Sequence, residues 1–250
     1  MLPILNVGPV AVQLPGLILI AGIWLGLLLA ERNANRYGIS PAGLNNMIFV
    51  ALISGVLGAR LIYVTSNWEA FADNLGSIFS LNPGLLDAWG GVLCAILAGL
   101  IYGQRKQMPF WATLDALTPM LAVLGISVAL ANLSSGSGYG RPTDLPWGIE
   151  LLGQKRHPSQ VYEAVAATVI LGLLWPGRGL LRNARPGVYF LCIIAASAGT
   201  RLFLEAFRGN SQLLFSGLRS AQVGAWIVLA ASLIGIFYFS RKIPTKTEME

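Results

Sequence analysis

The residues that could do chemistry lie inside or beside long apolar segments. Arg60 falls within one hydrophobic run and Arg201 within another. Tyr63 lies one helical turn after Arg60, on the same face. An ionisable side chain inside a membrane helix costs about 2.5–3.5 kcal/mol on insertion scales, so its presence needs a structural or functional reason. Arg60, Tyr63 and Arg201 are therefore candidate site residues.

Further polar residues gather at one end of their apolar runs. Glu205 and Arg208 follow Arg201 at i+4 and i+7. The others lie at the start of the run near residue 159 or close the run before it: Asn132, His157, Gln160 and Glu163. If the runs cross a membrane, all these positions fall on its outer side. The sequence therefore predicts one polar cluster built from at least four spans.

Structural roles compete with functional ones at these positions. Arg201 and Glu205 could form an ion pair that neutralises two buried charges, and Arg60 could extend to lipid phosphates. His157 could cap the loop before a helix, and Glu163 near a helix N-terminus is favoured by the helix dipole alone. The convergence of these residues favours a site more than any single residue does.

An anionic lipid headgroup is the ligand that suits such a cluster. Arginine pairs with phosphate oxygens through a planar fork that remains charged. The stretch 134–138, rich in glycine and serine, is either a flexible loop or a place where backbone N–H groups approach an anion. Acyl chains would lie between the apolar helices. The residues therefore indicate a phospholipid partner.

The composition excludes an ordinary water-soluble domain. Of 250 residues, 55% are hydrophobic and 11% charged, and the mean hydropathy is +0.65. Soluble domains carry about 25% charged residues. The net charge of +6 does not indicate nucleic acid binding, because Lys and Arg on short membrane loops give the same total. One His and two Cys, far apart in sequence, give no metal-ligand spacing, so we expect neither metal nor cofactor.

Seven apolar runs are long enough to span a membrane and leave no room for a separate soluble domain. The chain is therefore predicted to be an all-α polytopic membrane protein with a single domain over residues 1–250. The spans are expected near 13–30, 47–66, 86–103, 112–131, 159–175, 187–207 and 221–240. The aromatic segment 67–85 is expected to form an amphipathic arm on the bilayer surface.

Lys and Arg in the loops set the orientation, because short cytoplasmic loops retain an excess of positive charge. Ten lie on one side, namely Arg32, Arg36, Arg105, Lys106, Arg178, Arg182, Arg185, Arg241, Lys242 and Lys246. Five lie on the other, namely Arg141, Lys155, Arg156, Arg208 and Arg219. We therefore predict an external N-terminus and a cytoplasmic C-terminus.

A long segment of the chain resembles a known family. Residues 156–163, Arg-His-Pro-Ser-Gln-Val-Tyr-Glu, closely resemble the Arg-His-Pro-Ser-Gln-x-Tyr-Glu segment of prolipoprotein diacylglyceryl transferases. Segments 58–63, 90–91, 132–141 and 201–208 are similar to that family in the same order. The resemblance covers nearly the whole chain, including the seven spans and the external N-terminus.

The resemblance implies an enzyme of the bacterial inner membrane. Such enzymes transfer the diacylglyceryl group of phosphatidylglycerol to the lipobox cysteine thiol in the signal peptide of a prolipoprotein and release glycerol phosphate. Arg201 and Asn132 match positions regarded as essential in the family, and Gly140 matches an important glycine. We expect Arg201 and His157 to be catalytic and the other candidates to bind substrate: Arg60, Tyr63, Asn132, Gly140, Arg141, Gln160, Glu163, Glu205 and Arg208.

The chain departs from the family pattern at positions that carry chemistry. Trp89 stands where the family has a histidine proposed as the base, and Ala129 where it has an essential arginine. Trp cannot accept a proton and Ala cannot pair with phosphate, whereas the His157 imidazole could replace the base. Two interpretations follow. The protein is an active transferase with altered site chemistry, or a catalytically impaired homologue that binds phospholipid or a membrane partner without transfer.

Overall fold

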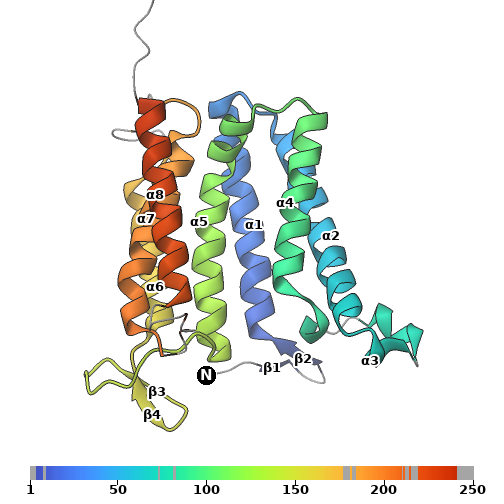
Figure 1. The fold of residues 1–250 in the computed structure, drawn as a ribbon, viewed down its shortest axis with the longest axis vertical. Helices are drawn as coiled ribbons and strands as arrows, with labels where there is room; N and C mark the ends of the chain where they lie inside the picture. The colour runs from blue at the N-terminus through green and yellow to red at the C-terminus, as the bar shows by residue number, and fades with distance from the viewer. Residues whose placement is uncertain are drawn as a thin grey trace, which may run out of the picture. The chain divides into compact units, whose positions relative to one another are not determined.

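The computed structural model describes residues 4–7, 10–72, 74–80, 83–176, 181, 184–209, 211, 214 and 219–240. The chain divides into two compact units. Unit 1 comprises Met1–Asn33 and Leu114–Glu250, and unit 2 comprises Ala34–Thr113. Each unit is built mainly from long apolar helices (Figure 1).

Unit 2 is organised by the pairing of α2 (Pro41–Ser66) with α4 (Ala88–Arg105). Glycines allow the two backbones to approach closely. A Cβ at Gly58 would overlap the Cys94 side chain, and one at Gly91 would lie 2.9 Å from the Cβ of Ala59. Close contact through small residues is the usual means of packing helices within a membrane, where no hydrophobic drive between helices operates.

The segment between α2 and α4 forms short helical pieces rather than one amphipathic helix. These are α3 (Glu69–Ala72) and two 3-10 helices, Leu75–Phe79 and Pro83–Leu85. Phe71 of α3 is buried, whereas Phe79 is 85% exposed. The aromatic residues of the predicted arm therefore do not share one face.

The described residues of unit 1 include all or most of five long helices: α1 (Leu14–Ala34), α5 (Phe110–Ser135), α6 (Ser159–Leu173), α7 (Val188–Leu204) and α8 (Ser220–Ser240). α7 packs against both α6 and α8. The carboxylate of Asp115 on α5 is buried and accepts hydrogen bonds from the N–H groups of Gly187 and Phe190, at 2.6 and 2.8 Å. It satisfies N–H groups at the start of α7 that have no partner within that helix.

The described residues are mostly helical, as the sequence predicts, and they also form two short β-hairpins. β1 (Ile4–Val7) pairs with β2 (Val10–Gln13), and β3 (Ile149–Leu151) pairs with β4 (Gln154–Arg156), both antiparallel. Isolated bridges join Gly140 to Arg208 and Pro142 to Arg156. Strands of three or four residues are too short to produce a recognisable alternation of apolar and polar residues.

Within the described part of the chain, five helices are long and apolar enough to cross a membrane: those within Leu14–Tyr37, Pro41–Ser66, Phe110–Ser135, Val188–Phe207 and Ser220–Ser240. The predicted spans near 86–103 and 159–175 correspond to α4, which ends in Gln104 and Arg105, and to α6, which has 15 residues. A helix of that length extends about 22 Å, less than the roughly 30 Å of a bilayer core.

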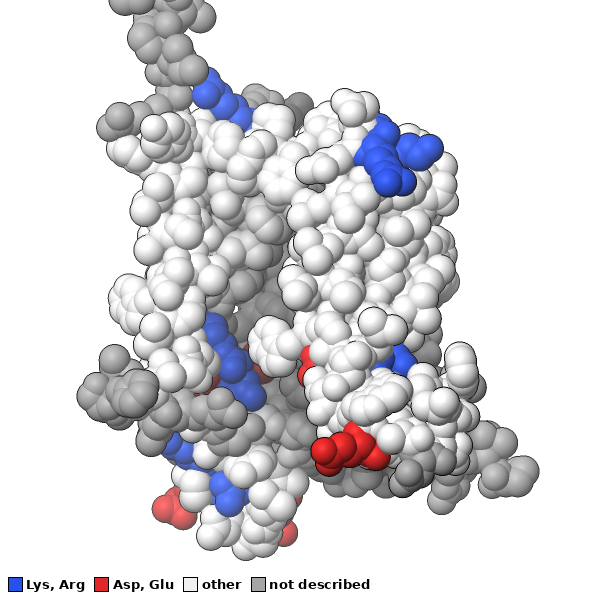
Figure 2. All heavy atoms as spheres, turned by 45° about the vertical axis from the view of Figure 1, so that its right-hand side comes forward, with Lys and Arg blue, Asp and Glu red and all other residues white. Residues whose placement is uncertain are grey.

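The helix flanks have the surface of a membrane protein. Large apolar side chains such as Trp24, Leu57 and Ile227 are 61–65% exposed. In Figure 2 the charged side chains lie toward the ends of the helices and the flanks between them carry none. Of the basic residues that set the predicted orientation, Arg178, Arg182, Arg241, Lys242 and Lys246 lie outside the described residues.

Candidate functional site

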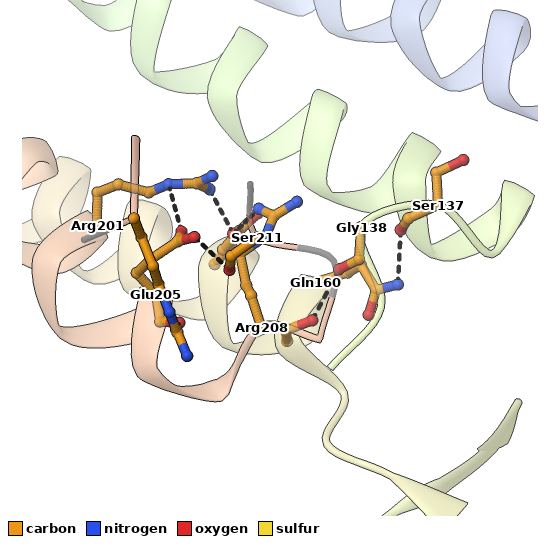
Figure 3. A network of polar contacts seen from close by, with 10 residues as sticks. Ser137, Gly138, Gln160, Arg201, Glu205, Arg208 and Ser211 are labelled. Carbon is orange, nitrogen blue, oxygen red and sulfur yellow. Dashed lines mark hydrogen bonds and ion pairs between the residues drawn. The ribbon is translucent and has the colours of Figure 1, made fainter. Parts of the chain in front are cut away.

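A chain of ion pairs joins α6 to the end of α7. One carboxylate oxygen of Glu163 accepts from both Arg201 and Arg208, with Nη1–Oε1 distances of 2.8 and 2.6 Å. Arg201 Nε lies 3.3 Å from Oε2 of Glu205, one turn further along the chain. Figure 3 shows Arg201 of α7 beside Glu205 of the 3-10 turn Glu205–Phe207, with Arg208 and Ser211 close by. Of the residues predicted to cluster, Glu163, Arg201, Glu205 and Arg208 are thus joined in one network of ion pairs.

Glu205 is the most deeply buried member of the network. Its side chain is 1% exposed, and its Oε1 accepts a 2.6 Å hydrogen bond from Ser211 Oγ. The guanidinium of Arg219 donates to the Glu205 backbone carbonyl. A buried carboxylate is tolerated only when it is paired and hydrogen-bonded, and Arg201 and Ser211 provide this compensation for Glu205. Arg201 and Arg208 pair with the two carboxylates, and Arg219 adds a third positive charge at the Glu205 backbone, so the cluster has a positive excess that suits an anionic ligand.

The first turn of α6 fastens the loop that follows α5. Gln160 is 1% exposed and donates from Nε2 to the Ser137 carbonyl at 2.8 Å, while Ser159 Oγ donates to the Gly138 carbonyl at 2.8 Å. Gln160 therefore acts on the loop through a backbone contact, as Figure 3 shows. Its own Oε1 is buried without a hydrogen-bond partner among the described residues.

Two positions in this loop require glycine. Gly138 has φ +64°, and a Cβ there would lie 2.8 Å from Nη2 of Arg208. A Cβ at Gly140 would overlap the carbonyl oxygen of His157. The loop therefore lies directly against Arg208 and His157, which explains in steric terms why the matched segment carries a glycine at position 140.

His157 lies in an aromatic cluster beside the ion pairs. Its Nδ1 is 3.4 Å from the hydroxyl of Tyr162, which also accepts a 2.9 Å hydrogen bond from Trp147 Nε1. Phe207 packs edge-on against both His157 and Tyr162. Sequence reasoning did not assign Trp147, Tyr162 or Phe207 to the site, although Tyr162 lies within the segment 156–163 that signalled the family.

Asn132 and Arg141 have side-chain hydrogen-bond donors that are not used within the described part of the chain. Asn132 lies in the last turn of α5 and is partly exposed, and Arg141 is exposed beyond the loop. The side chains of both lack hydrogen-bond partners among the described residues. Arg141 is fixed through its backbone, which accepts from the His157 N–H and donates to the Phe207 carbonyl, both at 2.9 Å. Both residues therefore have donors free for a ligand.

Arg60 and Tyr63 belong to unit 2 and have a network of their own. The Arg60 guanidinium donates to the carbonyls of Ser77, Leu85 and Ile78 at 2.7–2.8 Å. It also lies 5.5 Å from the centroid of the Phe71 ring, which makes a T-shaped contact with the Tyr63 ring. Within its unit, Arg60 thus holds the segment between α2 and α4.

The two departures from the family pattern lie in different surroundings. Trp89 is the second residue of α4 and is 85% exposed. Ala129 lies on α5, three residues before Asn132, and is 3% exposed. Among the described residues no group of three or more His, Cys, Asp or Glu could hold a metal ion.

Some residues of the site could not be predicted from any pattern in the sequence. Ser211 follows the 3-10 turn in a segment without periodic pattern, and its contact with Glu205 depends on how the chain folds back. The Arg219 contact arises in the same way. Ser159 lies within the family segment, which was a usable signal for it.

Apolar helices with exposed flanks, and a cationic cluster where α5 and α7 end and α6 begins, define a membrane protein with a candidate anion site. Comparison with known families narrows this class. The family model described as prolipoprotein diacylglyceryl transferase matches residues 3–238. The chain therefore belongs to the prolipoprotein diacylglyceryl transferase family.

Individual relatives agree with this assignment. A phosphatidylglycerol–prolipoprotein diacylglyceryl transferase of Clostridioides difficile is 33% identical over 233 residues, covering 91% of this chain and 90% of the relative. Proteins with the same name from Acaryochloris marina and Chloroflexus aggregans are 29% and 32% identical, over 96% and 81% of this chain and 92% and 74% of the relatives. Similarity to named transferases along almost the full length favours an enzyme over a catalytically impaired homologue.

Proposed function

We propose that this protein transfers the diacylglyceryl group of phosphatidylglycerol to the lipobox cysteine of prolipoproteins, in lipoprotein biosynthesis. The observation that carries the proposal is the meeting of Arg201 and Arg208 on one oxygen of Glu163, at helix ends, in a chain of this family. An oxygen of a phosphate group could take the place of this carboxylate oxygen between the two guanidiniums.

The reaction is a displacement at carbon. The cysteine sulfur attacks the glycerol carbon that carries the phosphate ester, a C–S bond forms, and the C–O bond breaks. The electron pair of that bond leaves with the oxygen of glycerol phosphate, and the thiol proton passes to solvent or to the released phosphate. The leaving oxygen gains negative charge in the transition state, so cations fixed beside it accelerate the step.

Arg201 and Arg208 supply these cations. Glu205 holds Arg201 in place, and the Glu163 carboxylate occupies the position between the two guanidiniums until the lipid phosphate replaces it. Asn132 and Arg141 contribute further donors to the headgroup. Gln160 and Gly140 shape the loop against which the headgroup lies. Arg60 and Tyr63, which contact the segment between α2 and α4, bind substrate as a second contact. His157 takes part at the reacting centre.

The membrane arrangement belongs to the same proposal. Residues 1–250 act as a single membrane domain in the bacterial inner membrane, with seven spans formed by α1, α2, α4, α5, α6, α7 and α8. The N-terminus is external and the C-terminus cytoplasmic, as the ten inward Lys and Arg indicate. This orientation places the end of α7 that carries Arg201 on the outer side, where signal peptides emerge from translocation.

A transfer assay tests the function directly. The purified protein is reconstituted in phosphatidylglycerol vesicles with a lipobox peptide, and mass spectrometry follows the mass of the peptide. We expect the peptide to gain one diacylglyceryl group, and a peptide with the cysteine replaced by serine to remain unmodified. Phospholipid detected on the protein by native mass spectrometry without any transfer would overturn the proposal. In that case transfer by a Trp89→His, Ala129→Arg double variant would show that only the chemistry had been lost.

A further inference from the structure

The imidazole of His157 lies at the end of a hydrogen-bond chain that begins on a tryptophan. Trp147 Nε1 is 2.9 Å from the hydroxyl oxygen of Tyr162, and that oxygen is 3.4 Å from Nδ1 of His157. Phe207 closes the cluster, with its ring centroid 5.2 Å from that of His157 and 6.0 Å from that of Tyr162. The orientation of the imidazole is therefore fixed by groups on both sides.

The direction of the hydrogen bonds follows from the chemistry of the three groups. An indole N–H can only donate, so the Tyr162 oxygen accepts from Trp147. The hydroxyl proton of Tyr162 then needs an acceptor, and Nδ1 of His157 is the one within reach among the described residues. A neutral imidazole that accepts at Nδ1 carries its proton on Nε2. A hydroxyl proton donated by Tyr162 to Nδ1 would thus favour one of the two tautomers.

The Nε2 side of the ring remains available to a ligand. His157 is partly exposed, and its Nε2 has no hydrogen-bond partner among the described residues. The backbone of Arg141 is bonded to that of His157, and the Arg141 guanidinium is exposed and likewise without a partner there. An N–H donor and a cation on two residues whose backbones are hydrogen-bonded to each other suit an anionic oxygen.

We propose that Trp147 and Tyr162 are positioning residues that hold His157 in the Nε2–H tautomer, so that it donates a hydrogen bond to the phosphate of the lipid substrate. Its assignment to the lipid phosphate rests on the proposed function. In this proposal His157 donates a hydrogen bond to the leaving group. It does not act as the base, the role suggested for it because Trp89 stands where the family has a histidine. The basic nitrogen Nδ1 faces Tyr162 and is not presented to an acceptor thiol.

The tautomer can be measured without any turnover, because the chain contains one histidine. The protein is labelled with nitrogen-15 at histidine, purified through an affinity tag free of histidine, and examined in lipid nanodiscs by long-range proton–nitrogen correlation spectroscopy above the pH at which the ring is protonated. We expect a pyrrole-type signal for Nε2 and a pyridine-type signal for Nδ1. A spectrum dominated by the opposite tautomer would overturn the proposal.

Two variants test the hydrogen-bond chain. Tyr162→Phe should move both nitrogen signals toward the average of the two tautomers, and Trp147→Phe should move them in the same direction by less. Matched controls on α8 are Tyr238→Phe and Trp226→Phe, whose side chains are 79% and 63% exposed. These controls should leave the histidine signals in place. Unchanged signals in Tyr162→Phe would refute the positioning role.

Activity then separates a donor from a base. Gln can place an N–H close to the Nε2 position of histidine but cannot accept a proton, so His157→Gln should retain much more transfer than His157→Ala. Loss of a hydrogen bond to a charged group predicts a fall of about ten- to a hundredfold in His157→Ala. Equal loss in both variants would contradict the donor role.

Failure of the proposal and failure of the proposed function give different results. If the wild-type protein transfers no diacylglyceryl group but shows the Nε2–H tautomer with the expected response to Tyr162→Phe, the function is wrong and the positioning holds. If transfer is normal and the tautomer is reversed, the function stands and the positioning is wrong.

Discussion

Arg60 and Arg201 are two arginines in apolar helices that are satisfied in different ways. Arg60, in unit 2, donates to three backbone carbonyls of the segment between α2 and α4. Arg201, in unit 1, pairs with the carboxylates of Glu163 and Glu205. Both arrangements compensate a charge that would otherwise be costly in an apolar environment.

The difference lies in whether an incoming anion can take the place of the partners. The carbonyls around Arg60 belong to the backbone, so releasing them means unfolding the segment. The carboxylate of Glu163 is a side chain shared by Arg201 and Arg208, so a rotation of that side chain would free both guanidiniums without unfolding the backbone. The contrast predicts that loss of Arg60 acts first on stability, whereas Arg201 and Arg208 exchange a carboxylate for the phosphate of a substrate.

Replacement of Arg201 should have the largest effect. In Arg201→Ala, transfer to the lipobox peptide should fall by about a hundred- to a thousandfold, the usual cost of removing one group that stabilises transition-state charge. Arg201→Lys keeps the charge but not the planar fork, and should lie between this variant and the wild type. Initial rates in phosphatidylglycerol vesicles provide the measurement.

The control for Arg201 is an arginine away from the ion pairs. Arg105 lies in the last turn of α4 and is exposed, so Arg105→Ala should transfer at close to the wild-type rate. Comparable rates for Arg201→Ala and the wild type would break the contrast between the two arginines.

Replacement of Arg60 should act first on stability. Arg60→Ala leaves three carbonyls without their donor and removes the stacking on Phe71. Several linked hydrogen bonds to a charged group are worth about 2–4 kcal/mol together. Thermal unfolding in detergent and limited proteolysis within residues 67–86 should both show the loss. A fall in phosphatidylglycerol affinity with unchanged unfolding would instead support the prediction that Arg60 binds lipid directly.

The helices could be predicted from the sequence because hydropathy and length are local properties. The run containing Arg60 marked a long helix, although α2 begins six residues earlier than expected, at Pro41 behind the capping residue Ser40. The three-residue strands β3 and β4 carry too little pattern to be found in this way. The partition of α2 and α4 into a separate unit depends on long-range packing and left no local sign.

Within the site, contacts between residues one helical turn apart could be predicted from the sequence, whereas contacts between distant segments could not. Helical periodicity placed Glu205 on the same face as Arg201, which the ion pair confirms. The sharing of Glu163 by two arginines depends on how α6 packs on α7, and the partners of Arg60 are carbonyls, which every residue possesses. Side-chain identity can point to a charged cluster, but it cannot say which backbone atoms complete it.

Neutralising Glu163 should change lipid binding by less than the loss of Arg201 changes transfer. In Glu163→Gln, the charge that competes with phosphate for Arg201 and Arg208 is gone, while the shape of the side chain is nearly kept. Affinity for phosphatidylglycerol should therefore rise by several-fold, as measured by native mass spectrometry across a lipid titration, and the salt dependence of binding should become steeper. Weaker binding in this variant would mean that Glu163 organises the arginines rather than competing with the lipid.

The smallest expected effect tests how the buried end of the network is held. Ser211→Ala removes the hydroxyl that donates to Oε1 of Glu205, a carboxylate whose side chain is 1% exposed. Loss of one donor to a buried charge should lower stability by about 1–2 kcal/mol and reduce transfer several-fold, because Arg201 then loses a fixed partner.

The matched variant is Ser77→Ala in unit 2. The exposed hydroxyl of Ser77 donates to the Asn74 carbonyl, and the backbone carbonyl of Ser77 accepts from Arg60. That change should stay within about 0.5 kcal/mol, since the backbone contact to Arg60 is untouched. Equal losses of stability in the two serine variants would show that burial of Glu205 does not distinguish the two networks.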